Sequence, residues 1–263
     1  RVGLDEMFAV ELSLPLPRDV WLPEVQVMVA RDEQGSPGGL YVAAKGGHNA
    51  ESHNHNDVGN VIVYAGGKPL IVDAGVETYT RKTFSAERYT IWTMQSSHHT
   101  LLPTVDGVLQ SPGKVFAARD VAYTSGDDEA RFTLDIAGAY PTEARIERWQ
   151  RAVTLHRGCE VEIADSYQLA GPAAEIEASL LTPCYVQLGE TGEIALTAAP
   201  MAGERMSGAG WVRYDPNVFA VSVHEIAIDD SRLGGVWGER LNRILFTARK
   251  PPQEGAWTFA IGP

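Results

Sequence analysis

This sequence of 263 residues has few cysteines, a deficit of basic side chains and no long apolar run. Its two cysteines, Cys159 and Cys184, are too few for a disulfide framework, so we expect free, buried thiols. It has 22 Lys and Arg against 34 Asp and Glu, and the net charge of −12 argues against nucleic acid or an anionic membrane as partner. No segment approaches the roughly 18 apolar residues that span a bilayer.

Helical periodicity is also scarce, and alternation of apolar and polar residues takes its place. Phe132 and Leu134 alternate with charged residues, as do Val161 and Ile163. Half-polar strands pack one face and leave the other in water, which is typical of antiparallel sheets. The sequence therefore predicts an all-β fold, a large antiparallel β-sandwich with few or no long helices. A change of phase at residues 224–225 predicts a β-bulge.

The chain divides unevenly. Residues 1–19 include Pro15 and Pro17 and have the character of an N-terminal remnant or linker. Residues 20–263 are expected to form one β-rich domain. Within it, a hairpin over residues 61–73 turns at two glycines, and residues 79–95 form a polar, aromatic loop whose length suggests a function.

Histidines are concentrated in one stretch. Five of the seven lie between His48 and His99, and His53, His55 and Asp57 recur at every second position. In an extended strand these three side chains share a face, which would make a partial metal site. Nitrogen ligands with a carboxylate suit zinc, and other divalent metals less specifically. The competing interpretation is a hydrogen-bonded polar loop without a metal.

Other candidates surround this cluster. Asp73 ends the hairpin over residues 61–73, and of the adjacent His98 and His99 at most one can join the site if the chain is extended there. His48 follows two glycines and would touch solvent or substrate. Arg81, Lys82 and Arg88 give the loop a local positive charge that would suit an anionic substrate. The alternative is that they form an ordinary solvated loop face.

Several short motifs within residues 46–107 carry a family resemblance. They are Gly46-Gly47-His48, the Ser-His-Asn-His-Asn-Asp-Val-Gly-Asn run at 52–60, the Pro-Leu-Ile-Val-Asp-Ala-Gly run at 69–75, Tyr79, Ser97-His98, Thr100-Leu101 and Val105-Asp106-Gly107. This stretch resembles the heparinase II/III-like domain of polysaccharide lyases, which act on heparin, heparan sulfate, alginate and related uronate polymers. The β-rich remainder fits the C-terminal sandwich of that family by pattern.

The resemblance implies one zinc ion, structural or orienting in role, held by His55, Asp73 and His98. The family has Asn after the downstream histidine where this chain has His99, so the register between the two histidines is open and His98 is favoured. The resemblance also implies substrate-facing catalytic candidates, namely His53, Tyr79 and Tyr89. We expect substrate contacts from His48, Arg81, Arg88 and His99.

The implied reaction is β-elimination at a uronate, which needs a base, an acid and groups that neutralise the sugar carboxylate. In the family the main base and acid lie in an α/α toroid domain before the sandwich, and this sequence contains no such helical array. We therefore expect that toroid as a partner domain, an anionic polysaccharide as substrate and a periplasmic or secreted location. Whether the isolated chain is an enzyme is open.

Three alternatives compete with this interpretation. A metallo-β-lactamase-like motif would need histidine where Val58 stands, and a cupin would need a glutamate within residues 59–65, which have none. The stronger alternative is a non-catalytic carbohydrate-binding, zinc-containing β-sandwich module.

Overall fold

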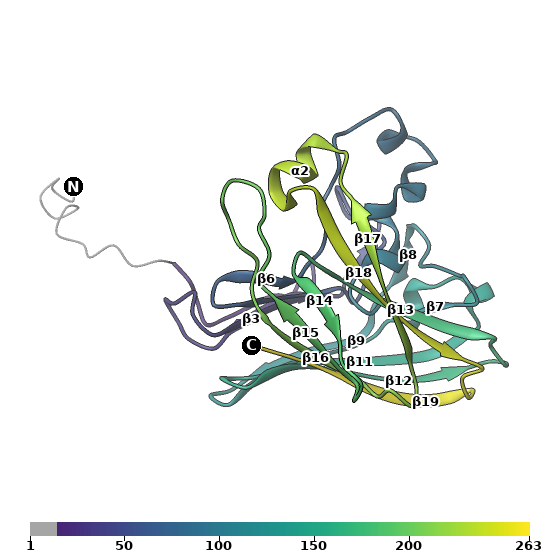
Figure 1. The fold of residues 1–263 in the computed structure, drawn as a ribbon. Coiled ribbons are helices and arrows are strands. Elements are labelled where there is room, and N and C mark those ends of the chain that lie inside the picture. Colours follow the sequence, from purple (N-terminus) through teal and green to yellow (C-terminus); the bar gives the residue numbers. More distant parts are fainter. Residues whose placement is uncertain (1–14) are drawn as a thin grey trace, which may run out of the picture.

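The structure is a computed structural model that describes residues 15–263, so most of the expected N-terminal remnant lies outside the described residues. Within this range the chain forms four antiparallel sheets (Figure 1). The predicted all-β sandwich is confirmed. No described helix is both long and apolar enough to cross a membrane.

Two sheets form the body of the sandwich. In spatial order, the five-stranded sheet consists of β1 (Asp19–Leu22), β2 (Val27–Arg31), β3 (Leu40–Lys45), β5 (Val61–Ala65) and β6 (Lys68–Ile71). The eight-stranded sheet consists of β14 (Tyr185–Leu188), β15 (Glu193–Thr197), β16 (Gly210–Arg213), β19 (Glu254–Gly262), β12 (Glu160–Leu169), β11 (Ile146–His156), β10 (Glu129–Asp135) and β9 (Arg119–Ser125).

Smaller elements complete the domain. A four-stranded sheet contains β17 (Ala220–Ala227), β18 (Arg240–Arg249), β13 (Glu175–Thr182) and β7 (Thr104–Val105), and a two-stranded sheet pairs β4 (His48–Asn49) with β8 (Gly113–Ala117). The predicted functional loop at 79–95 holds three 3₁₀ turns, and a fourth follows it: η1 (Lys82–Phe84), η2 (Arg88–Thr90), η3 (Trp92–Met94) and then η4 (Ser96–His98). Further turns are η5 (Ala137–Ala139) and η6 (Thr142–Ala144), and the single α-helix among the described elements is α2 (Ser231–Trp237).

The main core lies between the eight-stranded sheet and the five- and four-stranded sheets. Alternate side chains of β3 and β12 are buried, as the alternation predicts. Phe132, Trp149 and Phe259 are fully buried in this core, and each such burial contributes about 1.5–3 kcal/mol. Apolar packing is therefore the main source of stability, and the sandwich gives the functional loops a rigid base.

Two local expectations are corrected. The β-bulge predicted at residues 224–225 is absent, because β17 pairs with β18 in one continuous register. The phase changes because Val221 packs on the main core whereas Ile226 packs on a second apolar cluster around Trp237. Both cysteines are free, but only Cys184 is buried, and Cys159 is exposed in the turn before β12.

Candidate metal centre

Three side chains converge beside the end of the β5–β6 hairpin. His55 lies on the loop between β4 and β5, Asp73 lies two residues after the end of β6, and His99 directly follows η4. Their nearest ligand atoms all lie within 4.8 Å of one another. Two imidazoles and a carboxylate match the ligand types that zinc takes in proteins.

His99 carries the clearest sign that a metal fits. Its ring is almost fully buried, yet neither ring nitrogen has a hydrogen-bond partner. Nδ1 lies 3.0 Å from Asp73 Oδ2, but the two atoms are not aligned for a hydrogen bond. Because buried polar atoms nearly always have partners, such an arrangement suits two ligand atoms directed at a shared cation.

The histidine register differs from the favoured expectation. The structure brings His99, not His98, to His55 and Asp73. The His98 ring packs edge-on against Trp92, with centroids 5.4 Å apart, and its Nδ1 lies 3.1 Å from Ser97 Oγ. Burial, reinforced by the charge of Arg243, lowers the pKa of His98 to about 3, so its ring is neutral. His99, for which the sequence predicts a substrate contact, is buried in the cluster.

The electrostatics of the cluster are dominated by mutual attraction. Burial alone would raise the pKa of Asp73, but the charge of His99 and an N–H bond from Gly75 hold it far below its usual range. Burial would lower the pKa of His99, but Asp73 raises it above the ordinary value. Burial does lower the pKa of His55. Asp73 and His55 are therefore already in the ionisation states that a metal requires.

Asp57 does not belong to the cluster, which revises the three-residue strand motif first considered. Its Oδ1 pairs with Lys45 Nζ at 2.8 Å, and Lys45 also bonds Glu51. Burial would lower the pKa of Lys45, but the two carboxylates raise it. Lys45, Asp57 and Asp73 share the wall of a hollow of about 240 Å³ over the outer face of β3 and β5, so the cluster borders open space.

The predicted catalytic residues gather on the adjacent loop. Tyr79 Oη lies 3.5 Å from His53 Nδ1, and the two rings are stacked, with centroids 6.5 Å apart. His53 has a φ of 58°, a left-handed conformation that is uncommon for a non-glycine residue. Tyr89 Oη donates to Asn54 Oδ1 at 3.1 Å. His53 and Tyr79 are exposed and adjacent, whereas the Tyr89 hydroxyl is engaged in holding the loop.

The remaining predicted contacts fall into different settings. Arg88 donates to the carbonyl oxygens of Asn54 and Thr83, so it links the 79–95 loop to the loop between β4 and β5. Arg81 is exposed at the start of η1. His48 is half-buried on β4, and its Nδ1 accepts the N–H of Ala50.

Sequence reasoning missed two residues that hold the cluster. Asn60 donates from Nδ2 to Asp73 Oδ2 at 3.0 Å and accepts the N–H of Thr100 at 2.9 Å. Arg151 of β11 is fully buried. It forms a two-bond ion pair with Asp165 and donates to three backbone carbonyl oxygens. These are Gly59 O at 2.9 Å, Thr100 O at 3.2 Å and Leu101 O at 2.6 Å. The available signal was an arginine on the inward face of a strand, where the alternate residues Trp149, Val153 and Leu155 are apolar.

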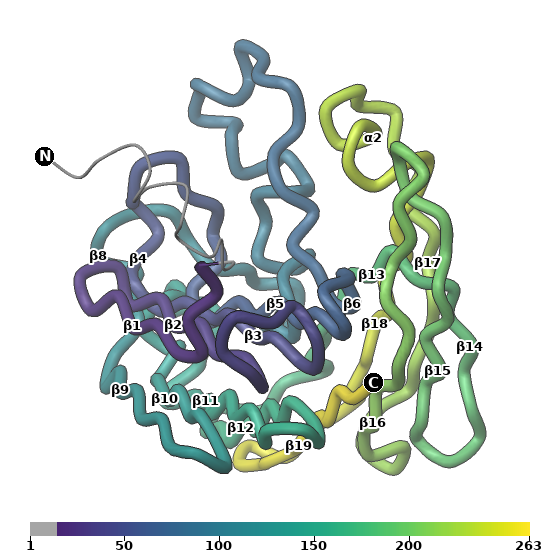
Figure 2. Tube along the Cα trace, turned by 90° about the vertical axis from the view of Figure 1, so that its left-hand side faces the viewer, coloured from purple at the N-terminus to yellow at the C-terminus, as the bar shows by residue number. Residues whose placement is uncertain are grey.

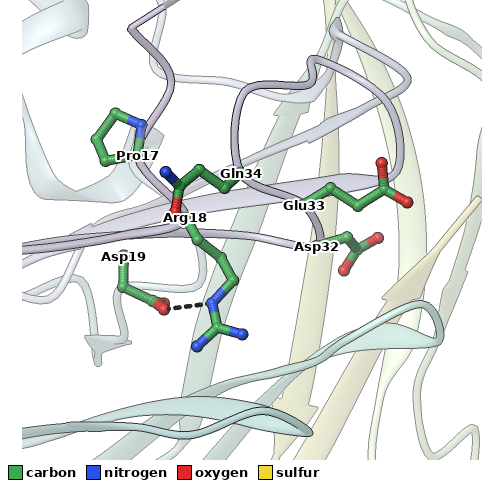
Figure 3. Close-up of a pocket in the computed structure, with 6 residues that line it drawn as sticks. All are labelled: Pro17, Arg18, Asp19, Asp32, Glu33 and Gln34. Atoms are coloured by element: carbon green, nitrogen blue, oxygen red, sulfur yellow. Dashed lines mark hydrogen bonds and ion pairs between the residues drawn. The ribbon is translucent and has the colours of Figure 1, made fainter.

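A hollow larger than the one beside the cluster lies elsewhere in the described structure. It measures about 580 Å³ and is lined by residues near β1 and by the β2–β3 loop (Figure 3). Two of its three acids have structural partners: Asp19 pairs with Arg18 and Arg157, and Asp32 accepts the N–H groups of Leu40 and Gly158.

The chain matches one known protein family over most of its length. Residues 17–255 match the model of the family described as heparinase II/III-like, C-terminal. The chain belongs to this family. A search of curated protein sequences found no match.

Solved structures of the same architecture agree with this membership in the heparinase II/III-like, C-terminal family. A heparan sulfate lyase HepC from Pedobacter heparinus superposes with a TM-score of 0.74 at 13% identity, over 98% of this chain and 38% of that one. A heparinase III gene product gives 0.74 at 15% identity, with the same coverages. A further heparinase III gives 0.67 at 14% identity, over 95% and 37%. This chain thus spans less than half the length of these proteins.

Proposed function

We propose that this chain is the zinc-binding, sugar-facing domain of a polysaccharide lyase that cleaves uronate-containing polymers by β-elimination. The observation that carries the proposal is the convergence of His55, Asp73 and His99 next to the exposed His53–Tyr79 pair. Membership in a heparinase-like family supports the reaction class.

β-Elimination requires a base at C5 and an acid at the leaving oxygen on C4. A base removes the C5 proton, its electron pair forms the C4–C5 double bond, and the C4–oxygen bond breaks as the leaving oxygen gains a proton. A phenol and an imidazole within 3.5 Å can hold and pass that proton between them. When bound to His55, Asp73 and His99, zinc would supply a fixed positive charge that orders the loops carrying these residues.

Further parts of the machinery are proposed to lie outside this chain. The similar lyases are more than twice as long, which supports an additional partner domain such as the helical toroid of the parent protein. An anionic polysaccharide substrate and a periplasmic or secreted location belong to the same proposal. The short coverage equally favours the second candidate, a carbohydrate-binding zinc module without turnover of its own.

Two measurements test the proposal. The purified chain should contain about one zinc per molecule by elemental analysis. The parent protein should release unsaturated, ultraviolet-absorbing products from heparan sulfate or alginate. Zinc without product from any uronate polymer would reject the lyase in favour of the binding module. Absence of zinc after gentle purification would reject the metal centre.

Replacing Tyr79 with phenylalanine is expected to lower kcat of the parent lyase by about 10²-fold or more, because the hydroxyl that exchanges a proton with His53 is lost. Zinc content should not change, since Tyr79 is not among the converging ligands. The matched control is Tyr185→Phe, an exposed tyrosine on β14. Equal kcat values for the two variants would remove Tyr79 from the chemistry.

Zinc affinity is expected to fall in acid, because a bound metal requires a neutral imidazole. Asp73 raises the pKa of His99 above its ordinary value of about 6.5. The apparent Kd should therefore rise by about tenfold per pH unit as the pH falls below that raised pKa. Competition titrations with a zinc-sensitive dye across pH 5 to 8 measure the slope. A flat profile would show that His99 does not bind the metal.

A further inference from the structure

An exposed aromatic and cationic surface lies beside the candidate centre. Tyr79 and Phe84 of the loop meet edge to face, with centroids 5.5 Å apart. The Arg232 guanidinium of α2 lies 5.4 Å from the centroid of the Tyr79 ring. We call these three side chains the Tyr79 platform. Because Tyr79 also stacks on His53, the platform is continuous with the proposed catalytic pair.

The platform is held in place by contacts between the loop and α2, which stand side by side (Figure 2). Asp230 accepts the N–H groups of Arg232 and Leu233 at the start of α2 and that of Thr78 in the loop. Trp237 Nε1 donates to Ala74 O at 2.8 Å. Arg232 is therefore presented to Tyr79 by a fixed framework, and a ligand would find the two groups already arranged.

The exposure of these groups is unusual in combination. Phe84 is 73% exposed and Tyr79 is 40% exposed. A single exposed aromatic residue is ordinary, but here two lie together beside an arginine. Among residues 15–263 no carboxylate lies within 4.0 Å of the Arg232 guanidinium nitrogens, and the nearby Arg81 and Lys82 likewise form no ion pair. Glu77, just before the loop, and Glu87, within it, form no ion pair with these cations.

We propose that the Tyr79 platform is a subsite for an acidic sugar residue of the polymer, with Arg232 as its specificity-determining group. The apolar face of a pyranose ring would pack on Phe84 and Tyr79. A carboxylate or sulfate on the same ring would accept charge-assisted hydrogen bonds from Arg232. A neutral sugar would gain the packing alone. This inference rests on the proposed function, because it places the substrate of the same site.

Binding by the full chain tests the subsite. Two ligands are used, a heparan sulfate hexasaccharide and its desulfated, carboxyl-reduced counterpart. Each is titrated against the unsubstituted chain, the Arg232→Ala variant and the Phe84→Ala variant, and ligand-detected NMR gives the affinity. Arg232→Ala should weaken binding of the acidic hexasaccharide by about tenfold and leave the neutral one unchanged. Phe84→Ala should weaken both. The matched control is Arg213→Ala, whose guanidinium lies 4.0 Å over Trp211 on β16.

The outcomes separate this inference from the proposed function. Each of three results would overturn the subsite: Arg232→Ala binds the acidic hexasaccharide as tightly as the unsubstituted chain, Arg213→Ala loses as much affinity as Arg232→Ala, or the unsubstituted chain does not bind it. Zinc content and product release, measured on the same preparations, judge the lyase proposal independently. If the protein binds the acidic sugar through Arg232 but releases no product, the subsite proposal is supported and the lyase proposal is rejected.

Discussion

Replacing Arg151 with leucine is expected to destabilise the domain by about 3–5 kcal/mol. The substitution leaves the Asp165 carboxylate, 1% exposed, as a buried charge without its partner. It also removes the donors to Gly59 O, Thr100 O and Leu101 O, which tie the loop after His99 and the turn before β5 to the large sheet. Because these segments position the metal ligands, zinc affinity should fall together with stability.

Urea unfolding followed by circular dichroism measures this loss. The matched control is Arg131→Leu on the neighbouring β10, an exposed arginine that donates to Thr154 Oγ1. It should cost less than about 1 kcal/mol. The double variant Arg151→Leu with Asp165→Leu should recover part of the stability but not the zinc affinity, because the three carbonyl oxygens stay without donors. A single-variant loss no larger than that of the control would contradict the buried ion pair.

Replacing His99 with alanine is expected to abolish zinc binding, with affinity falling by more than about 100-fold, whereas His98→Ala should keep the metal. A ligand replacement should exceed the 10–100-fold loss typical of residues that only support ligands. The physical reason is direction: His99 faces Asp73 and His55, whereas His98 faces Trp92. The two variants remove the same group at neighbouring positions, so each controls the other.

Zinc content by elemental analysis and thermal unfolding with and without added zinc provide the readout. His99 is buried, and a cavity at that position costs stability by itself. Asp73→Asn, which keeps the side-chain volume, therefore serves as a second ligand variant and should also lose the zinc-dependent rise in Tm. If His98→Ala loses zinc and His99→Ala keeps it, the converging cluster is not the metal centre.

Much of the fold was predictable because strand burial has a local signal. The alternation around Val161 and Ile163 indicated one buried face and one solvent-facing side, and the hairpin that turns at Gly66 and Gly67 is where the sequence predicted it. The bulge at residues 224–225 was wrongly predicted, because a phase change arises equally when a continuous strand passes from one apolar cluster to another. Local alternation does not distinguish these two cases.

The sequence by itself determined the sandwich class, the stretch that holds the candidate site, and His55 and Asp73 as members of its cluster. Only the tertiary structure brought His99 rather than His98 to that cluster. His98 ends a 3₁₀ turn and His99 follows it in an extended conformation, so their side chains point in directions set by what packs around them. The tertiary structure also placed Arg151 beneath the site and Arg232 beside Tyr79, at separations of 50 and more residues along the chain. Such contacts depend on sheet register and on the docking of α2, and no local pattern encodes either.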